Sequence, residues 1–407
     1  MPKHILVISQ YFYPEPFRIN DMCSEWVKRG YKVTVLTGVP NYPEGRFYKG
    51  YGWFKKRKET WQGVRIIRVP ILSRGHSSIR LILNYYSFVA AGWFWKVFTG
   101  VKADLVFMFE VSPLTQAKVG VWYAKKRKVP CYLYVQDLWP DNLEVVGGIH
   151  NKYVLDHYGR MADNIYKHCD KIFVTSPSFV HEVRKRVFDN KDKVVYLPQY
   201  AENCYSPFPK QSLPEIPDDG RFKLIFTGNI GQAQGLGILP QAAKLLQAQN
   251  KIGVLFVIVG DGRYKEELLQ EIKAAQVEDM FLFVPRQPAE KIPAFLAACD
   301  AAFLSFMDTP LFAKTIPAKL QSYMACGMPI IASANGETER IIKEAACGVC
   351  CPIGDAAGLF QTVSEWAHGK DLKTMGSNGR KYFESYFSRE KFFDDVEREC
   401  SFRDPLP

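Results

Sequence analysis

The chain has 407 residues, of which 47% are hydrophobic and 23% charged, and it carries a formal net charge of +11. This length exceeds one ordinary hydrophobic core and predicts two or three domains, and the composition excludes an intrinsically disordered chain. The apolar run Ile5–Ile8 is too short for a signal peptide, and the ten scattered cysteines are typical of reduced thiols in a cytosolic protein.

The positive charge is concentrated in the first half. Residues 1–210 contain 32 Lys and Arg against 17 Asp and Glu, whereas residues 211–407 contain 21 against 25. A basic first half predicts an anionic partner, such as a membrane leaflet, a phosphorylated acceptor or a nucleic acid. The sequence has no RNP, zinc-finger or helix-turn-helix pattern, so we expect no nucleic-acid partner.

Short apolar runs alternate with amphipathic stretches in the first 200 residues, which predicts a parallel α/β sheet. Strands are expected at Ile5–Ser9, Lys32–Thr37, Arg65–Val69, Leu105–Phe109, Cys131–Val135, Lys171–Thr175 and Val194–Leu197. Helices are expected near Asp21–Arg29, Ile79–Thr99, Thr115–Lys126, Tyr153–His168 and Ser178–Val187.

The first strand-to-helix turn, Gln10–Asn20, contains no glycine, and this argues against a NAD-binding fingerprint. Glu15 and Arg18 in this turn are candidate acceptor contacts, and a plain loop ion pair is the alternative interpretation.

The stretch Leu81–Trp95 is uncharged, rich in aromatic residues and, at 15 residues, too short to span a bilayer. It is either a buried helix or a helix whose face dips into the membrane interface. KKRK occurs at Lys55–Lys58 and at Lys125–Lys128, and each run is most simply a solvated helix end or loop. With the basic first half, the two runs predict peripheral attachment to the anionic cytoplasmic face of a membrane.

The sequence VQDLWPDN, Val135–Asn142, follows a predicted strand at its carboxyl end, where open α/β sheets bind ligands. Asp137 is a candidate catalytic carboxylate, and the ring of Trp139 offers a stacking surface for an acceptor sugar. Asp141 is expected to cap the following turn.

The Pro-rich and polar stretch Pro198–Gly220 predicts a linker between domains. Strand–helix alternation then resumes. Strands are expected at Lys223–Thr227, Leu255–Val259, Met280–Val284, Ala301–Leu304 and Pro329–Ala332. Helices are expected at Leu236–Gln247, Tyr264–Ala275, Ala289–Ala298, Pro317–Cys326, Glu337–Ala345, Ala356–His368, Leu372–Tyr386 and Arg389–Glu399.

The second half opens with a glycine-rich loop between a predicted strand and a predicted helix, in the sequence LIFTGNIGQAQGLGIL. Glycine allows the backbone to approach a pyrophosphate and to point N–H groups at it, although a tight turn is the alternative. The candidate donor-binding residues of this loop are Gly228, Asn229, Gly231, Gln232, Gln234 and Gly235. In the next turn, Gly260–Gly262, Asp261 is expected to cap a helix.

Two further helices begin within KTIPAKLQSYMACGMPIIASANGETERII, Lys314–Ile342. Pro317 is expected in the first turn of one helix, Gly327 ends that helix in a left-handed conformation, and Gly336 leads into the next. Helix N-termini present free N–H groups and a partial positive charge, which suit a phosphate.

These motifs resemble the GT-B glycosyltransferases of family 4, and the resemblance covers nearly the whole chain. PAKLQSYMACGMPII matches the family's PxKLxxYMAxGxPII run. The family often has two glutamates eight positions apart, one facing the donor sugar and one the ribose. Lys314 and Ser322 stand at those positions, so these two roles are not carried over. The variant TIPxKLQxY resembles bacterial transferases of the colanic-acid and O-antigen type.

The resemblance implies two Rossmann-like domains facing a cleft and a last helix, Arg389–Arg403, that crosses back to the first domain. We therefore expect an acceptor and membrane-facing domain at 1–200, a linker at 201–220, a donor domain at 221–386 and the returning helix at 387–407. Arg286 matches an often basic position near the nucleotide base.

The resemblance also places Asp137 near the reacting sugar. Lys314 is assigned a catalytic role on the departing diphosphate, with Lys319 and Arg286 as the other cations. The remaining donor-binding candidates around Lys314 are Thr315, Ile316 and Ser322. Family membership implies retention of anomeric configuration.

We expect no metal, because the chain has no DxD in an apolar setting and no carboxylate–His cluster with metal spacing. Cys347–Cys350 has CxxC spacing, but no second ligand pair follows. No GxSxG elbow is present either. No cofactor is expected, since the nucleotide sugar is a substrate.

The sequence thus predicts a glycosyltransferase for surface polysaccharide such as O-antigen or capsule. The expected donor is a UDP-linked N-acetylhexosamine or deoxyhexosamine, and the expected acceptor is a polyprenyl-diphosphate-linked saccharide. The alternatives are a nucleotide-sugar 2-epimerase of the same fold, and a membrane-bound scaffold that binds nucleotide without catalysis.

Overall fold

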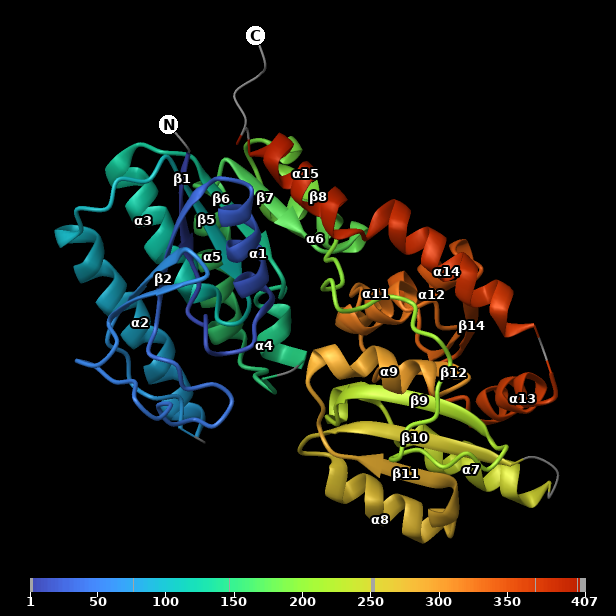
Figure 1. Ribbon diagram of the computed structural model, residues 1–407. Helices are drawn as coiled ribbons and strands as arrows, with labels where there is room; N and C mark the ends of the chain where they lie inside the picture. The colour runs from blue at the N-terminus through green and yellow to red at the C-terminus, as the bar shows by residue number, and fades with distance from the viewer. Residues whose placement is uncertain are drawn as a thin grey trace. The chain divides into compact units, whose positions relative to one another are not determined.

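The first half of the chain folds around a largely parallel sheet in the computed structural model, which describes residues 3–75, 77–145, 147–249, 253–369, 371–400 and 402. In this part of the chain the strands lie in the order β3-β4-β2-β1-β5-β6-β7-β8 (Figure 1). Their bounds are β1 His4–Ile8, β2 Lys32–Thr37, β3 Lys58–Trp61, β4 Val64–Arg68, β5 Leu105–Glu110, β6 Cys131–Val135, β7 Lys171–Val174 and β8 Val194–Tyr196. The seven expected strands are confirmed within one residue at each end, and β3 is additional.

The burial of each strand follows from its place in this sheet. Every residue of β1, β5 and β6 is buried, as expected for central parallel strands covered by helices on both faces. β3 alternates between exposed and half-buried residues and pairs antiparallel with β4 at the edge. The last residue of the first KKRK run, Lys58, therefore lies on an edge strand, which agrees with the use of charge to protect sheet edges.

The connecting helices of the first half are α1 Arg18–Lys28, α2 Ser78–Phe98, α3 Ala117–Arg127, α4 Asp141–Val145, α5 Lys152–Lys167 and α6 Pro177–Arg186. Asp141 is the first residue of α4. The second KKRK run ends α3, where the Lys126 amine donates to the carbonyls of Lys96 and Val97 and so caps the end of α2.

The aromatic helix α2 is buried on one side and exposed on the other. Phe88 and Val89 are buried, and Gly92 packs so closely on α3 that a Cβ there would lie 2.6 Å from the Val119 side chain. Its other side exposes a row of large apolar side chains, namely Ile79, Ile82, Leu83, Tyr86, Trp93, Phe94 and Phe98. No helix in the described ranges combines enough length and apolar character to cross a membrane.

The second half forms a six-stranded parallel sheet in the order β11-β10-β9-β12-β13-β14, counted over the same described ranges. The strands are β9 Phe222–Asn229, β10 Val254–Asp261, β11 Phe281–Val284, β12 Ala301–Ser305, β13 Ile330–Ser333 and β14 Gly348–Cys351. The helices are α7 Ile238–Ala248, α8 Lys265–Ala275, α9 Ile292–Ala297, α10 Pro310–Ala313, α11 Ala318–Ala325, α12 Gly336–Glu344, α13 Ala356–Ala367 and α14 Leu372–Tyr386.

Two hydrophobic cores cover the two faces of this second sheet. Leu224 and Phe226 of β9 pack with α7, α8 and α13, whereas Ile225 between them packs with α9, α11 and α12 on the other face. This alternation follows from the two-residue period of a strand. Both apolar faces are covered, which explains why the consecutive residues Leu224–Phe226 are all apolar.

Contacts divide the chain into two compact units, and each is described separately. The first comprises residues 1–175, 179–197 and 397–407, and the second comprises residues 176–178 and 198–396. The last helix, α15 Arg389–Glu399, begins in the second unit and ends in the first. Residues 401 and 403 of the expected range Arg389–Arg403 lie outside the described residues.

The end of α15 contacts the first unit through paired charges. Glu397 accepts from the Arg29 guanidinium at 3.1 Å, and the Glu399 carboxylate pairs with the Lys171 amine. Phe402, just beyond the helix, packs edge-on against the ring of Trp26.

Candidate functional site

A glycine-rich loop follows β9 at the carboxyl edge of the second sheet. β9 pairs with β10 on one side and with β12 on the other. The chain passes from β9 to β10 and from β12 to β13, so the connections that follow β9 and β12 leave in opposite directions. In an open α/β sheet this is the topological switch point, where ligands bind beyond the strand ends. The loop Asn229–Gly235 occupies this position.

The loop needs glycine at two points. Gly228 has φ +131° and Gly235 has φ +58°, both in the region that favours glycine, and a Cβ on Gly235 would lie 2.9 Å from the Phe306 carbonyl oxygen. The loop is fixed to the end of β12, where Met307 N donates to the Ala233 carbonyl at 3.1 Å and Ser305 Oγ donates to that of Gln234.

Lys319, in the first turn of α11, reaches the same loop. Its amine contacts the side-chain oxygen of Gln234 and lies 4.6 Å from the centre of the Phe226 ring. It also lies 3.6 Å from the position that a Cβ of Gly228 would occupy. Burial lowers the pKa of Lys319 from 10.5 to about 7, because a desolvated amine is less stable in its charged form. The sequence predicted this cation near the glycine loop, and the structure brings the two together.

Tyr323 of the same helix α11 attaches that helix to the end of β9. The buried Tyr323 hydroxyl accepts from the backbone N–H of Thr227 at 3.0 Å, one residue before Gly228. Pro317 is the N-cap of this helix rather than a first-turn residue, with φ −76° and ψ 142°. The extended conformation of Pro317 turns the preceding chain toward the strand ends.

The other candidates around Lys314 are arranged differently from the sequence expectation. Ile316 is 5% exposed and belongs to the hydrophobic core, and the Ser322 hydroxyl donates to the Ala318 carbonyl of its own helix. Thr315 donates in the same way to Leu311 at 2.9 Å. Ile316 is therefore a core residue, and the hydroxyls of Thr315 and Ser322 bond within their own segments; donor binding at these three positions stays a prediction.

Lys314 itself is half-buried at the end of α10, and its carbonyl accepts from Ser176 Oγ at 2.6 Å. Arg286 is exposed in the loop that follows β11. Asp261 does not cap α8: its carboxylate accepts from Gly262 N, and the N-cap residue of α8 is Tyr264. Cys350 and Cys351 lie on β14.

Glu337 lies in the first turn of α12, where the sequence predicts the start of a helix. It is buried, and its carboxylate accepts from the backbone N–H and the hydroxyl of Ser178 at 2.8 and 2.6 Å. The Arg340 guanidinium completes the group at 2.8 Å. An acidic residue directly after Gly336 at a helix N-terminus was the available signal.

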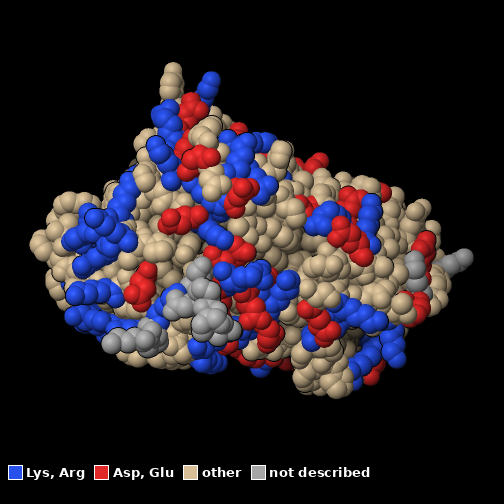
Figure 2. All heavy atoms as spheres, turned by 90° about the horizontal axis from the view of Figure 1, so that it is seen from above, with Lys and Arg blue, Asp and Glu red and all other residues tan. Residues whose placement is uncertain are grey.

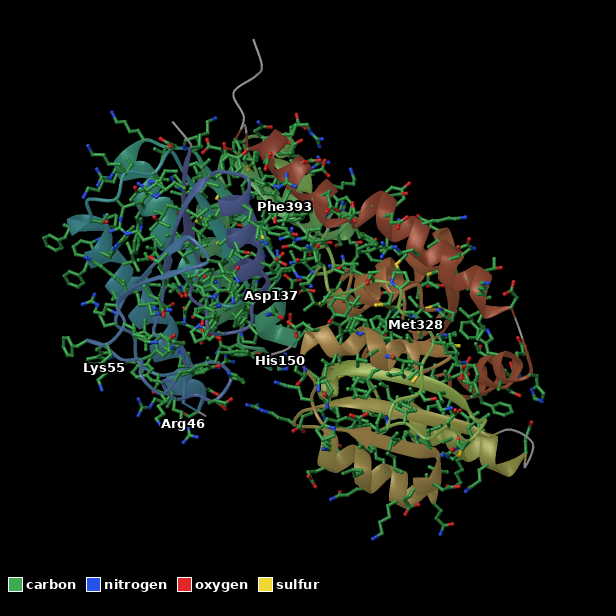
Figure 3. All side chains as sticks on the ribbon, in the orientation of Figure 1. Arg46, Lys55, Asp137, His150, Met328 and Phe393 are labelled. Carbon is green, nitrogen blue, oxygen red and sulfur yellow. The ribbon has the colours of Figure 1, made fainter. Side chains whose placement is uncertain are left out.

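In the first unit, Asp137 lies just beyond the carboxyl end of β6 (Figure 3). Its Oδ2 accepts from both the backbone N–H and the hydroxyl of Ser112, each at 2.7 Å. Burial raises the pKa of Asp137, and these two hydrogen bonds oppose the rise. Burial beside Asp137 also holds the pKa of Glu110, at the end of β5, well above its usual range. Burial therefore raises the pKa of both carboxyl groups.

Trp139 is not a stacking surface. It is 3% exposed, its ring packs edge-on against Tyr158, and its indole N–H donates to Ser112 Oγ at 3.2 Å. Through this hydrogen bond Trp139 helps to fix the Ser112 hydroxyl that donates to Asp137. The expectation that the Trp139 ring is an exposed stacking surface for a sugar is wrong, because the ring is buried.

Glu15 is also an internal residue. It is 1% exposed and accepts from the backbone N–H groups of Asn41 and Tyr42, each at 2.7 Å. Burial raises the pKa of Glu15 to about 7, against the effect of these donors. The carboxylate joins the loops after β1 and β2, so direct acceptor binding by Glu15 is not supported. Arg18 is half-buried at the start of α1.

Several polar residues that the sequence did not single out gather at the ends of β1 and β2. Arg74 lies 3.4 Å from the Tyr11 hydroxyl, and its guanidinium lies over the Tyr42 ring at 5.2 Å. Tyr85 of α2 faces the charges of Arg74 and Asp137. No group of three or more potential metal ligands occurs in the described residues.

Comparisons with known proteins agree with this architecture. Residues 17–199 match the model of the glycosyl transferase 4-like domain, and residues 209–382 match that of the glycosyl transferases group 1. A protein of Escherichia coli K12 named as the colanic acid biosynthesis glycosyl transferase WcaI is 24% identical over 82% of this chain and 84% of its own length. The N-acetyl-alpha-D-glucosaminyl L-malate synthase of Bacillus anthracis is 25% identical over 56% of this chain, and the match spans only 58% of that relative.

Solved structures share the fold across nearly the whole chain. Sucrose-phosphate synthase from Thermosynechococcus elongatus superimposes with a TM-score of 0.74 at 16% identity, over 98% of this chain and 99% of its own. HepE from Anabaena, solved in complex with UDP, gives a TM-score of 0.68 at 15% identity over 98% and 100%. The lipopolysaccharide glycosyltransferase WaaG gives 0.66 at 14% identity over 97% and 99%. The two matched domains and the paired α/β sheets show that the chain belongs to the GT-B glycosyltransferases of family 4.

Proposed function

We propose that the protein transfers a sugar from a UDP-linked N-acetylhexosamine or deoxyhexosamine to a saccharide carried on polyprenyl diphosphate. The proposed process is surface-polysaccharide synthesis at the cytoplasmic face of the membrane, with retention of anomeric configuration and without a metal. The observation that carries the proposal is the desolvated Lys319 amine beside the glycine loop at the switch point of the second sheet.

The second unit supplies the groups that a departing diphosphate requires. In the reaction the bond between the sugar C1 and the diphosphate oxygen breaks, the acceptor hydroxyl oxygen bonds to C1, and UDP leaves with the bonding electrons. Negative charge develops on the diphosphate, and we propose that the Lys319 ammonium and N–H groups of the loop stabilise it. The N–H groups of Ile230, Gln234 and Gly235 are not among these, because they already donate to backbone carbonyls. A cation there removes the need for a bound metal. Lys314 and Arg286 are the further candidates for this charge.

The first unit supplies a base. We propose that Asp137 takes the proton that the acceptor hydroxyl loses. Ser112 donates to this carboxylate and itself accepts from Trp139, and Tyr85 lies within electrostatic reach of Asp137 and Arg74. A raised pKa places a carboxylate nearer to the operating pH, where general bases are most effective.

The choice of donor and acceptor rests on the relatives. Three relatives have names that specify N-acetylglucosaminyl transfer, and the structures of HepE and of pneumococcal GtfA contain UDP. The similarity to WcaI over most of both chains supports polysaccharide synthesis. The exposed apolar row of α2 and the basic character of the first half support peripheral attachment to a membrane.

The test is a donor-turnover assay across UDP-, GDP- and dTDP-sugars, with and without a polyprenyl-diphosphate saccharide and with excess chelator. We expect release of UDP from one class of UDP-sugar, stimulation by the acceptor, and no effect of the chelator. An epimerised sugar nucleotide would support the 2-epimerase alternative instead, and UDP binding without any turnover would support the scaffold.

A further inference from the structure

Two adjoining hollows lie on the first unit beside α2. One has a volume of about 600 Å³ and lies between α2 and the segment 69–72 that follows β4. The other has a volume of about 820 Å³ and lies along β3, β4 and the end of α2. The two share Arg57, Trp95 and Phe98 in their walls, so they meet at these residues.

The first hollow is apolar. Its walls include Trp53, Ile71, Phe94 and the small side chains of Ala90 and Ala91. Trp53 and Phe94 are 45% and 58% exposed, and the Trp53 indole N–H donates to the Ile71 carbonyl at 2.7 Å, which fixes one wall. A concave site of this volume with mainly hydrophobic and aromatic walls is typical of binding sites for apolar ligands.

The second hollow is basic. Arg57, Lys58 and Arg65 are exposed around it. Lys58 pairs across the hairpin with Ile67, and Arg65 pairs with Thr60, so both cations stand on the same face of the two strands. Arg68, by contrast, is buried and bound to Glu59 at 2.8 Å, so its charge is already compensated. Figure 2 shows Lys and Arg side chains gathered at several places over the first unit, in the left-hand part of the view.

We propose that the two hollows together bind one chain of a lipid with an anionic head, namely the polyprenyl phosphate portion of the acceptor. The apolar hollow takes a segment of the isoprenoid chain, and Arg57, Lys58 and Arg65 hold the phosphate. The apolar hollow adjoins the basic hollow, so the two match the isoprenoid chain and the phosphate of such a lipid. A general attraction to anionic bilayers needs the charges but not the apolar hollow. The identity of the lipid rests on the proposed function, and the binding site does not.

Ala90→Trp tests whether the apolar hollow binds the isoprenoid chain. Ala90 is exposed on α2, so a larger side chain there fills the hollow without entering the core. Ile79→Trp is the matched control, because Ile79 is 72% exposed on the same helix and outside the hollow. The charge variant is Arg57→Gln/Lys58→Gln/Arg65→Gln, and its control is Lys55→Gln in the same basic run.

The measurement is co-sedimentation with phosphatidylcholine vesicles that contain a few mole per cent of undecaprenyl phosphate, with phosphatidylglycerol vesicles of equal charge as the comparison. We expect the wild type and both controls to bind the undecaprenyl phosphate vesicles at least 10-fold better than the comparison. Ala90→Trp and the triple variant should lose this preference while they keep their affinity for UDP.

Equal binding of Ala90→Trp and wild type to undecaprenyl phosphate would overturn the proposal, as would equal binding of the wild type to both vesicle types. Retained binding in a protein that turns over no UDP-sugar would contradict the proposed function and leave this site intact.

Discussion

The Lys319 amine lies 4.6 Å from the centre of the Phe226 ring, at the end of the strand that leads into the glycine loop. The ring and the desolvation act in opposite directions on this amine: a cation is attracted to the aromatic face, and burial disfavours its charge. Removal from water raises the strength of any interaction that the amine makes with a diphosphate. The burial of Lys319 therefore lowers the stability of the folded second unit, and the same burial strengthens the proposed contact with the diphosphate.

Lys319→Met should lower kcat. The loss of one charge-assisted contact to a leaving group costs about 2–4 kcal/mol of barrier, or roughly 30- to 900-fold in rate. Lys273→Met is the control, because Lys273 is exposed on α8 and the change removes the same charge. Steady-state UDP release measures both, and full activity of Lys319→Met would exclude a role for this amine.

The same substitution should raise the thermal stability of the free protein near neutral pH. Lys319 titrates at about 7 in the folded protein and near 10.5 when unfolded. Between these values the unfolded chain binds a proton that the folded protein does not, so the folded state loses stability as the pH falls from 10.5 to 7. Methionine removes this dependence. The Tm difference between variant and wild type should therefore be larger at pH 7 than at pH 10, and a difference that does not change with pH would contradict the assignment.

Gly235→Val should abolish UDP binding with little loss of fold. The new side chain meets the Phe306 carbonyl and is strained at φ +58°, so the loop must move away from β12. Gly52→Val is the control, since Gly52 lies in open space with no unusual φ. Calorimetric titration with UDP distinguishes the two variants, and circular dichroism confirms that each is folded. Undiminished UDP affinity in Gly235→Val would remove the loop from the donor site.

Trp139 and Trp93 should respond in opposite ways to truncation. Trp139→Ala empties a buried position and should cost about 3–5 kcal/mol in the free energy of unfolding. Trp93 is 44% exposed on α2, so Trp93→Ser should change Tm little while weakening vesicle binding. Urea denaturation and vesicle co-sedimentation give the two readouts. A large loss of stability in Trp93→Ser would place that face of α2 in the core.

The fold was predictable because its strands are short apolar runs with strong turn signals between them. β3 is not predictable because KETW is short, has only one strongly apolar residue and exposes Lys58 and Thr60. β14 is not predictable because GVCC is only four residues long. The glycine loop and Lys319 were predictable from glycine spacing and the PAKL run. Local sequence did not indicate that Trp139 and Glu15 are buried, since their partners Tyr158 and Asn41 come from distant segments. The electrostatic influence of Arg74 and Asp137 on Tyr85 joins three segments that are distant in the sequence.

We propose that the glycine-rich loop after β9, at the switch point of the second sheet, holds the donor diphosphate. Hydrogen–deuterium exchange with and without UDP tests it most directly, because it reports where the nucleotide protects backbone N–H groups. We expect UDP to slow the exchange of residues 227–237 and 314–320, and we expect this protection to be lost in Lys319→Met and Gly235→Val. Bound UDP with protection confined to other segments would contradict it.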